Sequence, residues 1–167
     1  SCRGPFEDGV RTLALPDPRT ADRTLPTDLW YPAAQEAGGA QADHPFGQPH
    51  AARVDAPPLD RANPLVVFSH GNAGLRRQST FLTTHLASWG IAVVAPDHMG
   101  NTFPEMARVS DEAHRIEVHR AARERRPHDA LTAIDAALSG ELGPVPLDPT
   151  RIAALGHSFG GWTATKL

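Results

Sequence analysis

The stretch Arg151-Ile152-Ala153-Ala154-Leu155 leads directly into Gly156-His157-Ser158-Phe159-Gly160-Gly161. The first run is typical of a buried strand. The second contains Gly-x-Ser-x-Gly, which presents a serine on a sharp turn between a strand and a helix. Gly156 and Gly160 leave room in this turn, because a Cβ at either position would collide with the adjoining strand or helix. The pattern predicts that Ser158 is a nucleophile that attacks acyl carbon atoms.

Strands and helices alternate upstream of this turn. Leu65-Val66-Val67-Phe68 is a continuous apolar run that suits a strand buried on both faces. The other expected elements are a helix over 81–89 that Gly90 ends, its apolar face formed by Phe81, Leu82, His85, Leu86 and Trp89; a strand over 91–95; a charged stretch over 107–126; a helix that Pro127 opens and Gly140 ends; and the strand over 151–155. This alternation predicts an α/β fold with a mostly parallel sheet and helices on both of its faces.

The first third of the chain is expected to contribute one short strand and a long irregular segment. Apolar and polar residues alternate over 27–31, and Pro32 closes this run. Residues 33–63 contain many glycines and prolines but few large apolar side chains, which indicates a loop insert. The 167-residue length fits one domain, so residues 1–167 are interpreted as part of a single domain with an insert at 33–63.

Charge and hydropathy exclude two classes of partner. The 16 basic residues and 19 acidic residues give a net charge of −3, which offers no electrostatic basis for binding nucleic acid. No apolar run approaches the roughly 18–20 residues that cross a membrane.

Cys2 is the only cysteine, so no disulfide within the chain is expected. A free thiol near a terminus is the commoner interpretation. The alternative is a cysteine that is acylated after a signal peptide has been removed, in which case the protein would be secreted or lipid-anchored.

A second loop is expected to serve the same chemistry. Ser69-His70-Gly71-Asn72-Ala73-Gly74 follows the strand over 65–68. Acyl transfer needs two backbone N–H groups directed at the oxyanion, one from the residue after the nucleophile and one from such a loop. Phe159 and Asn72 are the candidates for these oxyanion donors. His70 and Gly71 are interpreted as residues that shape the loop.

None of the nine histidines is a convincing general base. His157 adjoins the nucleophile, but successive residues on such a turn point apart. His98 follows an expected strand and is predicted to line the pocket, whereas His85 is predicted to pack on a helix face. The remaining histidines are predicted to be loop residues or solvated, and no spacing resembles a zinc site.

Four segments together resemble the α/β-hydrolase superfamily, and within it the bacterial esterases related to platelet-activating-factor acetylhydrolase and the predicted dienelactone hydrolases. They are Asp28-Leu29-Trp30-Tyr31-Pro32; Val66-Val67-Phe68-Ser69-His70-Gly71; Ala95-Pro96-Asp97-His98 with Gly100-Asn101-Thr102; and Arg126-Pro127-His128-Asp129 with the turn at Gly156–Gly161. The resemblance implies a serine hydrolase of short acyl esters, which are small-molecule substrates, with Ser158 as nucleophile, an acyl-enzyme intermediate and no metal or organic cofactor. A serine at this position departs from true dienelactone hydrolases, which use a cysteine.

The superfamily's triad acid and histidine follow the serine, yet residues 159–167 contain no Asp, Glu or His. Both are therefore expected beyond residue 167. The chain is interpreted as the N-terminal part of the domain, inactive alone, on which a C-terminal part with the later strands packs. Two alternatives remain: a non-catalytic binding module with this fold, and a related serine peptidase or lipase.

Overall fold

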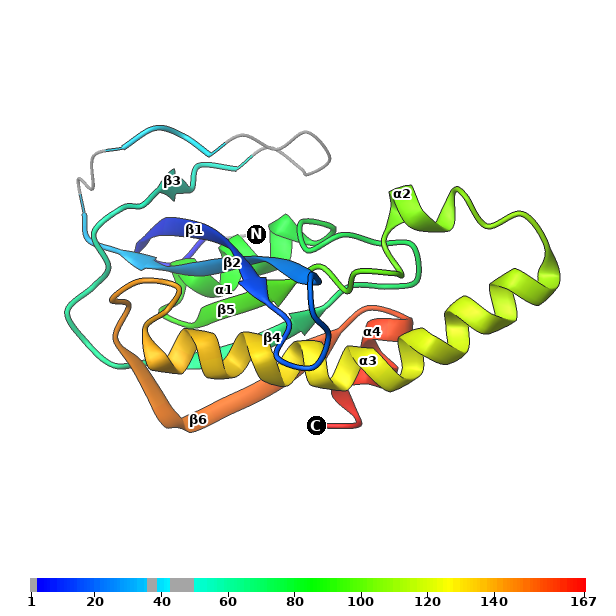
Figure 1. Cartoon of the computed structure of the whole chain (residues 1–167). Helices are drawn as coiled ribbons and strands as arrows, with labels where there is room; N and C mark the ends of the chain where they lie inside the picture. The colour runs from blue at the N-terminus through cyan, green and yellow to red at the C-terminus, as the bar shows by residue number, and fades with distance from the viewer. Residues whose placement is uncertain (1–2, 36–38, 43–49) are drawn as a thin grey trace.

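A computed structural model describes residues 3–35, 39–42 and 50–167. Its six-stranded sheet has the order β3-β1-β2-β5-β4-β6. The strands are β1 (Glu7–Pro16), β2 (Thr24–Ala33), β3 (Arg53–Val54), β4 (Asn63–Ser69), β5 (Ala92–Pro96) and β6 (Leu147–Gly156). The helices are α1 (Thr80–Ser88), α2 (Phe103–Met106), α3 (Glu112–Ser139) and α4 (Phe159–Ala164). Figure 1 shows α3 running along the sheet, with its first half extending past the strands.

The strand order brings two strand ends together at the site. β5, β4 and β6 are parallel neighbours, whereas β2 is antiparallel to both β1 and β5. The chain passes from β4 outward to β5 and then returns across β4 to β6. Ser69 at the end of β4 consequently lies opposite Gly156 at the end of β6. Ligands bind at such reversals, outside the carboxyl ends of parallel strands.

Alternate residues of β4 serve the two faces of the sheet. Leu65 and Val67 pack in a core beneath α3, whereas Val66 and Phe68 pack in a second core beneath α1. All four side chains are buried, as expected for a strand covered on both faces. The predicted layers, with helices on both faces of the sheet, are therefore confirmed.

The predicted apolar face of α1 is wrong in part. Phe81 is 59% exposed and Trp89 is 52% exposed. The buried face instead carries small residues, namely Thr80, Thr83, Thr84, Ala87 and Ser88. Small side chains let the helix approach the sheet closely. The helix therefore turns its small residues toward the sheet and leaves the larger aromatic side chains in solvent.

The prediction that Pro127 opens a helix is also wrong. α3 is a single 28-residue helix with Pro127 inside it. It begins after Asp111, whose carboxylate accepts a hydrogen bond from the His114 N–H at 2.9 Å. An internal proline removes one backbone hydrogen bond, but packing on both sides of Pro127 keeps the helix continuous. Gly140 ends the helix with φ of +81°, as predicted.

Several strands of the sheet differ from the prediction. The early strand is longer than expected, and it pairs with β1, which the sequence analysis did not identify. β6 begins four residues earlier than expected, at Leu147, and it is not buried: Ile152 is 41% exposed and lies on an edge strand of the described sheet. Within the proposed insert, the described residues include β3. Cys2 and His44 lie outside the described residues.

Candidate active site

Ser158 occupies the turn between β6 and α4 with φ of +53° and ψ of −116°. This conformation is unusual for a residue with a side chain and indicates a backbone held by its surroundings. Ser158 is exposed. No hydrogen-bond partner of its hydroxyl is present among residues 3–35, 39–42 and 50–167. The serine is thus an accessible, strained residue at the carboxyl end of a parallel strand.

Two glycines allow this turn to pack against β4. A Cβ on Gly160 would lie 1.8 Å from the carbonyl oxygen of Ser69, and one on Gly156 would lie 2.1 Å from the carbonyl carbon of Gly160. The His157 N–H also donates to the Ser69 carbonyl at 3.1 Å. The turn is therefore in direct contact with the end of β4.

The loop after β4 lies beside the turn. The Gly71 N–H donates to Gln78 Oε1 at 3.0 Å, and Gln78 Nε2 lies 2.8 Å from Nδ1 of His157. The backbone N–H groups of Asn72 and Phe159 have no acceptor within the described part of the chain. Asn72 is exposed, and Ala73 next to it has φ of +55°. The structure thus places the predicted nucleophile and both predicted oxyanion donors on two segments that contact each other.

His70 is buried and takes part in hydrogen bonds that shape the loop. Its Nε2 accepts the His98 N–H at 2.9 Å, so its Nδ1 carries the proton and donates to the Gly71 carbonyl at 2.7 Å. Burial, together with the nearby His98 and Arg126, holds the pKa of His70 well below its usual range. The ring is therefore neutral, and both of its nitrogens are hydrogen-bonded.

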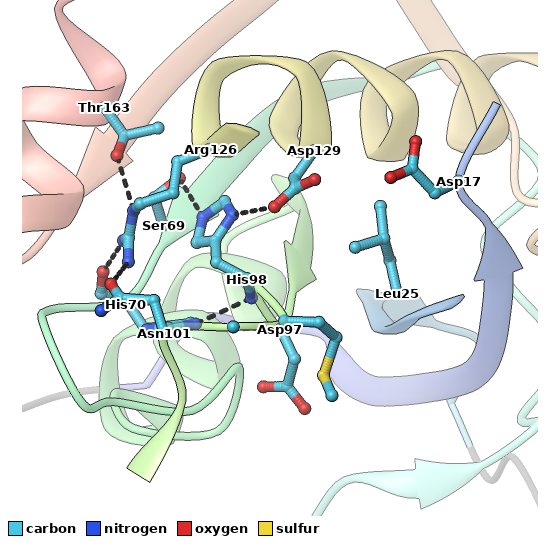
Figure 2. Close-up of polar contacts among 12 residues, drawn as sticks. Asp17, Leu25, Ser69, His70, Asp97, His98, Asn101, Arg126, Asp129 and Thr163 are labelled. Atoms are coloured by element: carbon cyan, nitrogen blue, oxygen red, sulfur yellow. Dashed lines mark hydrogen bonds and ion pairs between the residues drawn. The ribbon is translucent and has the colours of Figure 1, made fainter. Parts of the chain in front are cut away.

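The prediction that His98 lines the pocket is wrong. Its side chain is 1% exposed, with Nε2 3.1 Å from the Ser69 hydroxyl and Nδ1 3.1 Å from an Asp129 carboxylate oxygen (Figure 2). Burial lowers the pKa of His98 to about 4. Ser69, His98 and Asp129 are hydrogen-bonded one to the next, as serine, histidine and carboxylate are in a catalytic triad. This serine is buried, however, and cannot contact a substrate.

Arg23 completes this buried group. It donates to both carboxylate oxygens of Asp129, at 2.7 and 3.0 Å, and to the Asp17 carboxylate at 2.7 Å. A carboxylate held by two such bonds is fixed in orientation. Asp129 therefore anchors His98, and through it Ser69, to α3.

Arg126 is fully buried between α3 and the two site segments. It donates to the His70 carbonyl, to Asn101 Oδ1 at 2.7 Å and to the Thr163 hydroxyl at 3.0 Å (Figure 2). The sequence analysis gave Arg126 no role of its own, because it is one of many arginines in a charged stretch. Arg126 and Asn101 both belong to segments that carry the family resemblance, which is the one signal available in the sequence.

Aromatic side chains lie beside the nucleophile. The ring of Phe159 stacks on His119 at 4.5 Å and on Trp162 at 5.3 Å. Trp162 and His119 also line a hollow of about 680 Å³ next to α3. His119 was predicted to be solvated, but the structure shows it partly buried against Phe159.

The described residues contain no cluster of three or more His, Cys, Asp or Glu side chains arranged to hold a metal ion. None of their helices combines the length and apolar character needed to cross a membrane.

The loop after β4 lies in a segment that matches a known protein family. Residues 51–125 match the family model of platelet-activating factor acetylhydrolase, isoform II. This match includes the loop after β4 but not the turn at Ser158. No functionally curated protein matches significantly.

Several solved structures share the fold. A ferulic acid esterase from Streptomyces cinnamoneus is 26% identical with a TM-score of 0.72, over 96% of this chain and 55% of that one. A dienelactone hydrolase-like promiscuous phosphotriesterase from metagenomic libraries is 21% identical with a TM-score of 0.59, over 96% and 54%. A cold-adapted esterase from an Arctic intertidal metagenomic library is 18% identical with a TM-score of 0.54, over 92% and 52%.

The chain spans about half the length of these structures. The likeness to them extends over nearly all of this chain, and it agrees with the sheet order and with the strand-turn-helix arrangement at Ser158. The predicted fold is confirmed: the chain has the α/β-hydrolase fold and is similar to esterases of that superfamily.

Proposed function

We propose that the protein is a serine hydrolase of short acyl esters that works through an acyl-enzyme intermediate. The observation that carries the proposal is the conformation of Ser158, an exposed hydroxyl at φ of +53° held where β6 meets β4. The likeness to an acetylhydrolase family and to esterases supports an ester as substrate.

In this mechanism the Ser158 hydroxyl attacks the ester carbonyl carbon while a base removes its proton. The N–H groups of Asn72 and Phe159 donate to the oxygen that becomes negative. Each such donor contributes roughly 3–4 kcal/mol to lowering the barrier. The alcohol then leaves with the proton from the base, and water releases the acyl group from Ser158.

The base and the acid that orients it are proposed to come from polypeptide outside residues 1–167. This part of the proposal rests on the Ser158 hydroxyl, which bonds no histidine of the described residues, and on the buried, engaged state of His70 and His98. Residues 1–167 expressed alone are then expected to be inactive. An intact mass of the native protein no greater than that of this chain would contradict the proposal.

The direct test is Ser158→Ala in the native protein. We expect hydrolysis of p-nitrophenyl acetate to fall to the uncatalysed rate, and labelling by a fluorophosphonate probe to disappear, because both require the Ser158 oxygen. Ser139→Ala, at the far end of α3, is the matched control and is expected to keep both.

Retained turnover in Ser158→Ala would refute the assignment of the nucleophile. Absence of both turnover and labelling in the wild-type protein would favour a non-catalytic binding module. Hydrolysis of p-nitrophenyl acetate is expected to exceed that of the corresponding long-chain ester, and the reverse order would favour a lipase.

A further inference from the structure

Arg126 is a buried cation that bonds only neutral acceptors. Its guanidinium donates to a carbonyl, an amide oxygen and a hydroxyl, and among the described residues no carboxylate accepts from it. Asp129, one turn further along the same helix, is instead bound by Arg23. Burial lowers the pKa of Arg126 to about 10, so it remains charged at neutral pH. Burying such a charge is costly for folding, and an apolar side chain would fill the space without this cost.

Two of the three acceptors belong to the segments that build the predicted oxyanion site. The His70 carbonyl is in the loop that precedes Asn72, and Thr163 is in α4, which begins at Phe159. Asn101 lies on a third segment, the loop after β5. One guanidinium thus joins both halves of the site.

One further hydrogen bond leads from Arg126 to each predicted donor residue. Asn101 accepts from Arg126 and donates from Nδ2 to Asn72 Oδ1 at 2.8 Å. Thr163 accepts from Arg126 and donates to the Phe159 carbonyl at 3.1 Å. The guanidinium carbon also lies 4.6 Å from the centre of the Phe159 ring. Movement of Arg126 would therefore release both residues.

We propose that Arg126 is a positioning residue that holds the N–H groups of Asn72 and Phe159 at the separation an oxyanion requires. This inference rests on the proposed function. Preorganised donors act mainly on the charge that develops in the transition state. Loss of Arg126 is therefore expected to lower kcat far more than it changes KM.

The test is Arg126→Gln in the native protein, with p-nitrophenyl acetate as substrate. We expect kcat to fall on the order of 10–100-fold, since displacement of a site by about 1 Å costs up to that factor. KM is expected to stay within about threefold, because ground-state binding does not use the oxyanion. Affinity for a trifluoromethyl ketone, which forms an oxyanion on the serine, is expected to fall by the same factor as kcat.

Arg125→Gln is the matched control, because it removes a charge from the exposed neighbour on the same helix. It is expected to leave kcat and ketone affinity unchanged. Asn101→Ala is the second variant, for use if Arg126→Gln does not fold. It breaks the link to Asn72 and is expected to lower kcat and ketone affinity in parallel.

The outcomes separate the inference from the proposed function. Wild-type kcat in folded Arg126→Gln and in Asn101→Ala would overturn the inference alone, as would a rise in KM at unchanged kcat. Wild-type protein without Ser158-dependent turnover would overturn the proposed function and the inference together.

Discussion

At the scale of the residue, Gly160 determines whether the turn at Ser158 can form. The backbone of α4 approaches the Ser69 carbonyl so closely at this position that no side chain fits. Neither partner can move aside, because the Ser69 carbonyl belongs to β4 and also accepts the His157 N–H. Gly161 is different: a Cβ there would have its nearest contact at 3.5 Å, an ordinary van der Waals distance.

Gly160→Ala is therefore expected to displace α4 from β4 and to abolish fluorophosphonate labelling of Ser158, whereas Gly161→Ala is expected to keep labelling. The added methyl group would lie 1.8 Å from the Ser69 oxygen in the first variant only. Labelling rates and thermal unfolding of both variants check this. Equal labelling of the two would show that the close approach at Gly160 is not needed.

At the scale of the element, α3 combines two functions in one helix. Its second half packs on the sheet through Ala130, Ala133, Ile134 and Ala137. Arg126 and Asp129, near the middle, bond the loops of the candidate site. A helix that ends in a well-defined position keeps these side chains in place, and Gly140 provides that end.

Gly140→Ala is expected to lower the free energy of unfolding by about 1 kcal/mol, since a side chain is disfavoured at φ of +81°. No atom lies within 4 Å of the added Cβ, so the effect isolates backbone conformation from packing. Gly140→Asn is expected to cost less, because asparagine tolerates the left-handed region. Urea unfolding measures all three proteins, and equal stability of Ala and Gly would contradict the explanation.

At the scale of the whole molecule, buried polar groups connect segments that are far apart in the sequence. Arg23 in the β1–β2 region, His98 after β5 and Asp129 on α3 form one hydrogen-bonded group. Because His98 is neutral when folded, its protonation is coupled to unfolding. The pKa of His98 lies near 4 in the folded protein, against 6.5 ordinarily.

Stability is therefore expected to fall as the pH is lowered from about 6.5 to about 4. In this range unfolded His98 takes up a proton that folded His98 does not, and the loss is on the order of 3 kcal/mol. His70, whose pKa is also lowered by burial, acts in the same direction. Urea unfolding at a series of pH values measures the slope.

His98→Gln is expected to flatten this slope, whereas His114→Gln, at an exposed position, is expected to keep it. Asp8 opposes the trend, because burial raises its pKa to about 6 and makes its ionisation unfavourable in the folded state. The difference between wild type and His98→Gln removes this contribution. An unchanged slope in His98→Gln would show that His98 does not control the acid response.

Much of the fold follows from local sequence. Apolar runs at 65–68 and 91–95 coincide with β4 and β5, and Gly-x-Ser-x-Gly predicts the turn at Ser158. These features depend on neighbouring residues: a strand needs a run of apolar side chains, and a tight turn needs glycine. The exposed aromatic residues of α1 and the continuous α3 were not predicted, because their packing partners lie elsewhere in the chain.

The sequence by itself determined the strand-turn-helix that presents Ser158, since its residues are contiguous and their sizes restrict the backbone. Only the tertiary structure decided which polar residues support that turn. Arg126, Asn101 and Asn72 are separated by 25 and 29 residues along the chain and meet through hydrogen bonds in the interior. Such bonds depend on how the sheet brings loops together, and no local pattern of residue types specifies them.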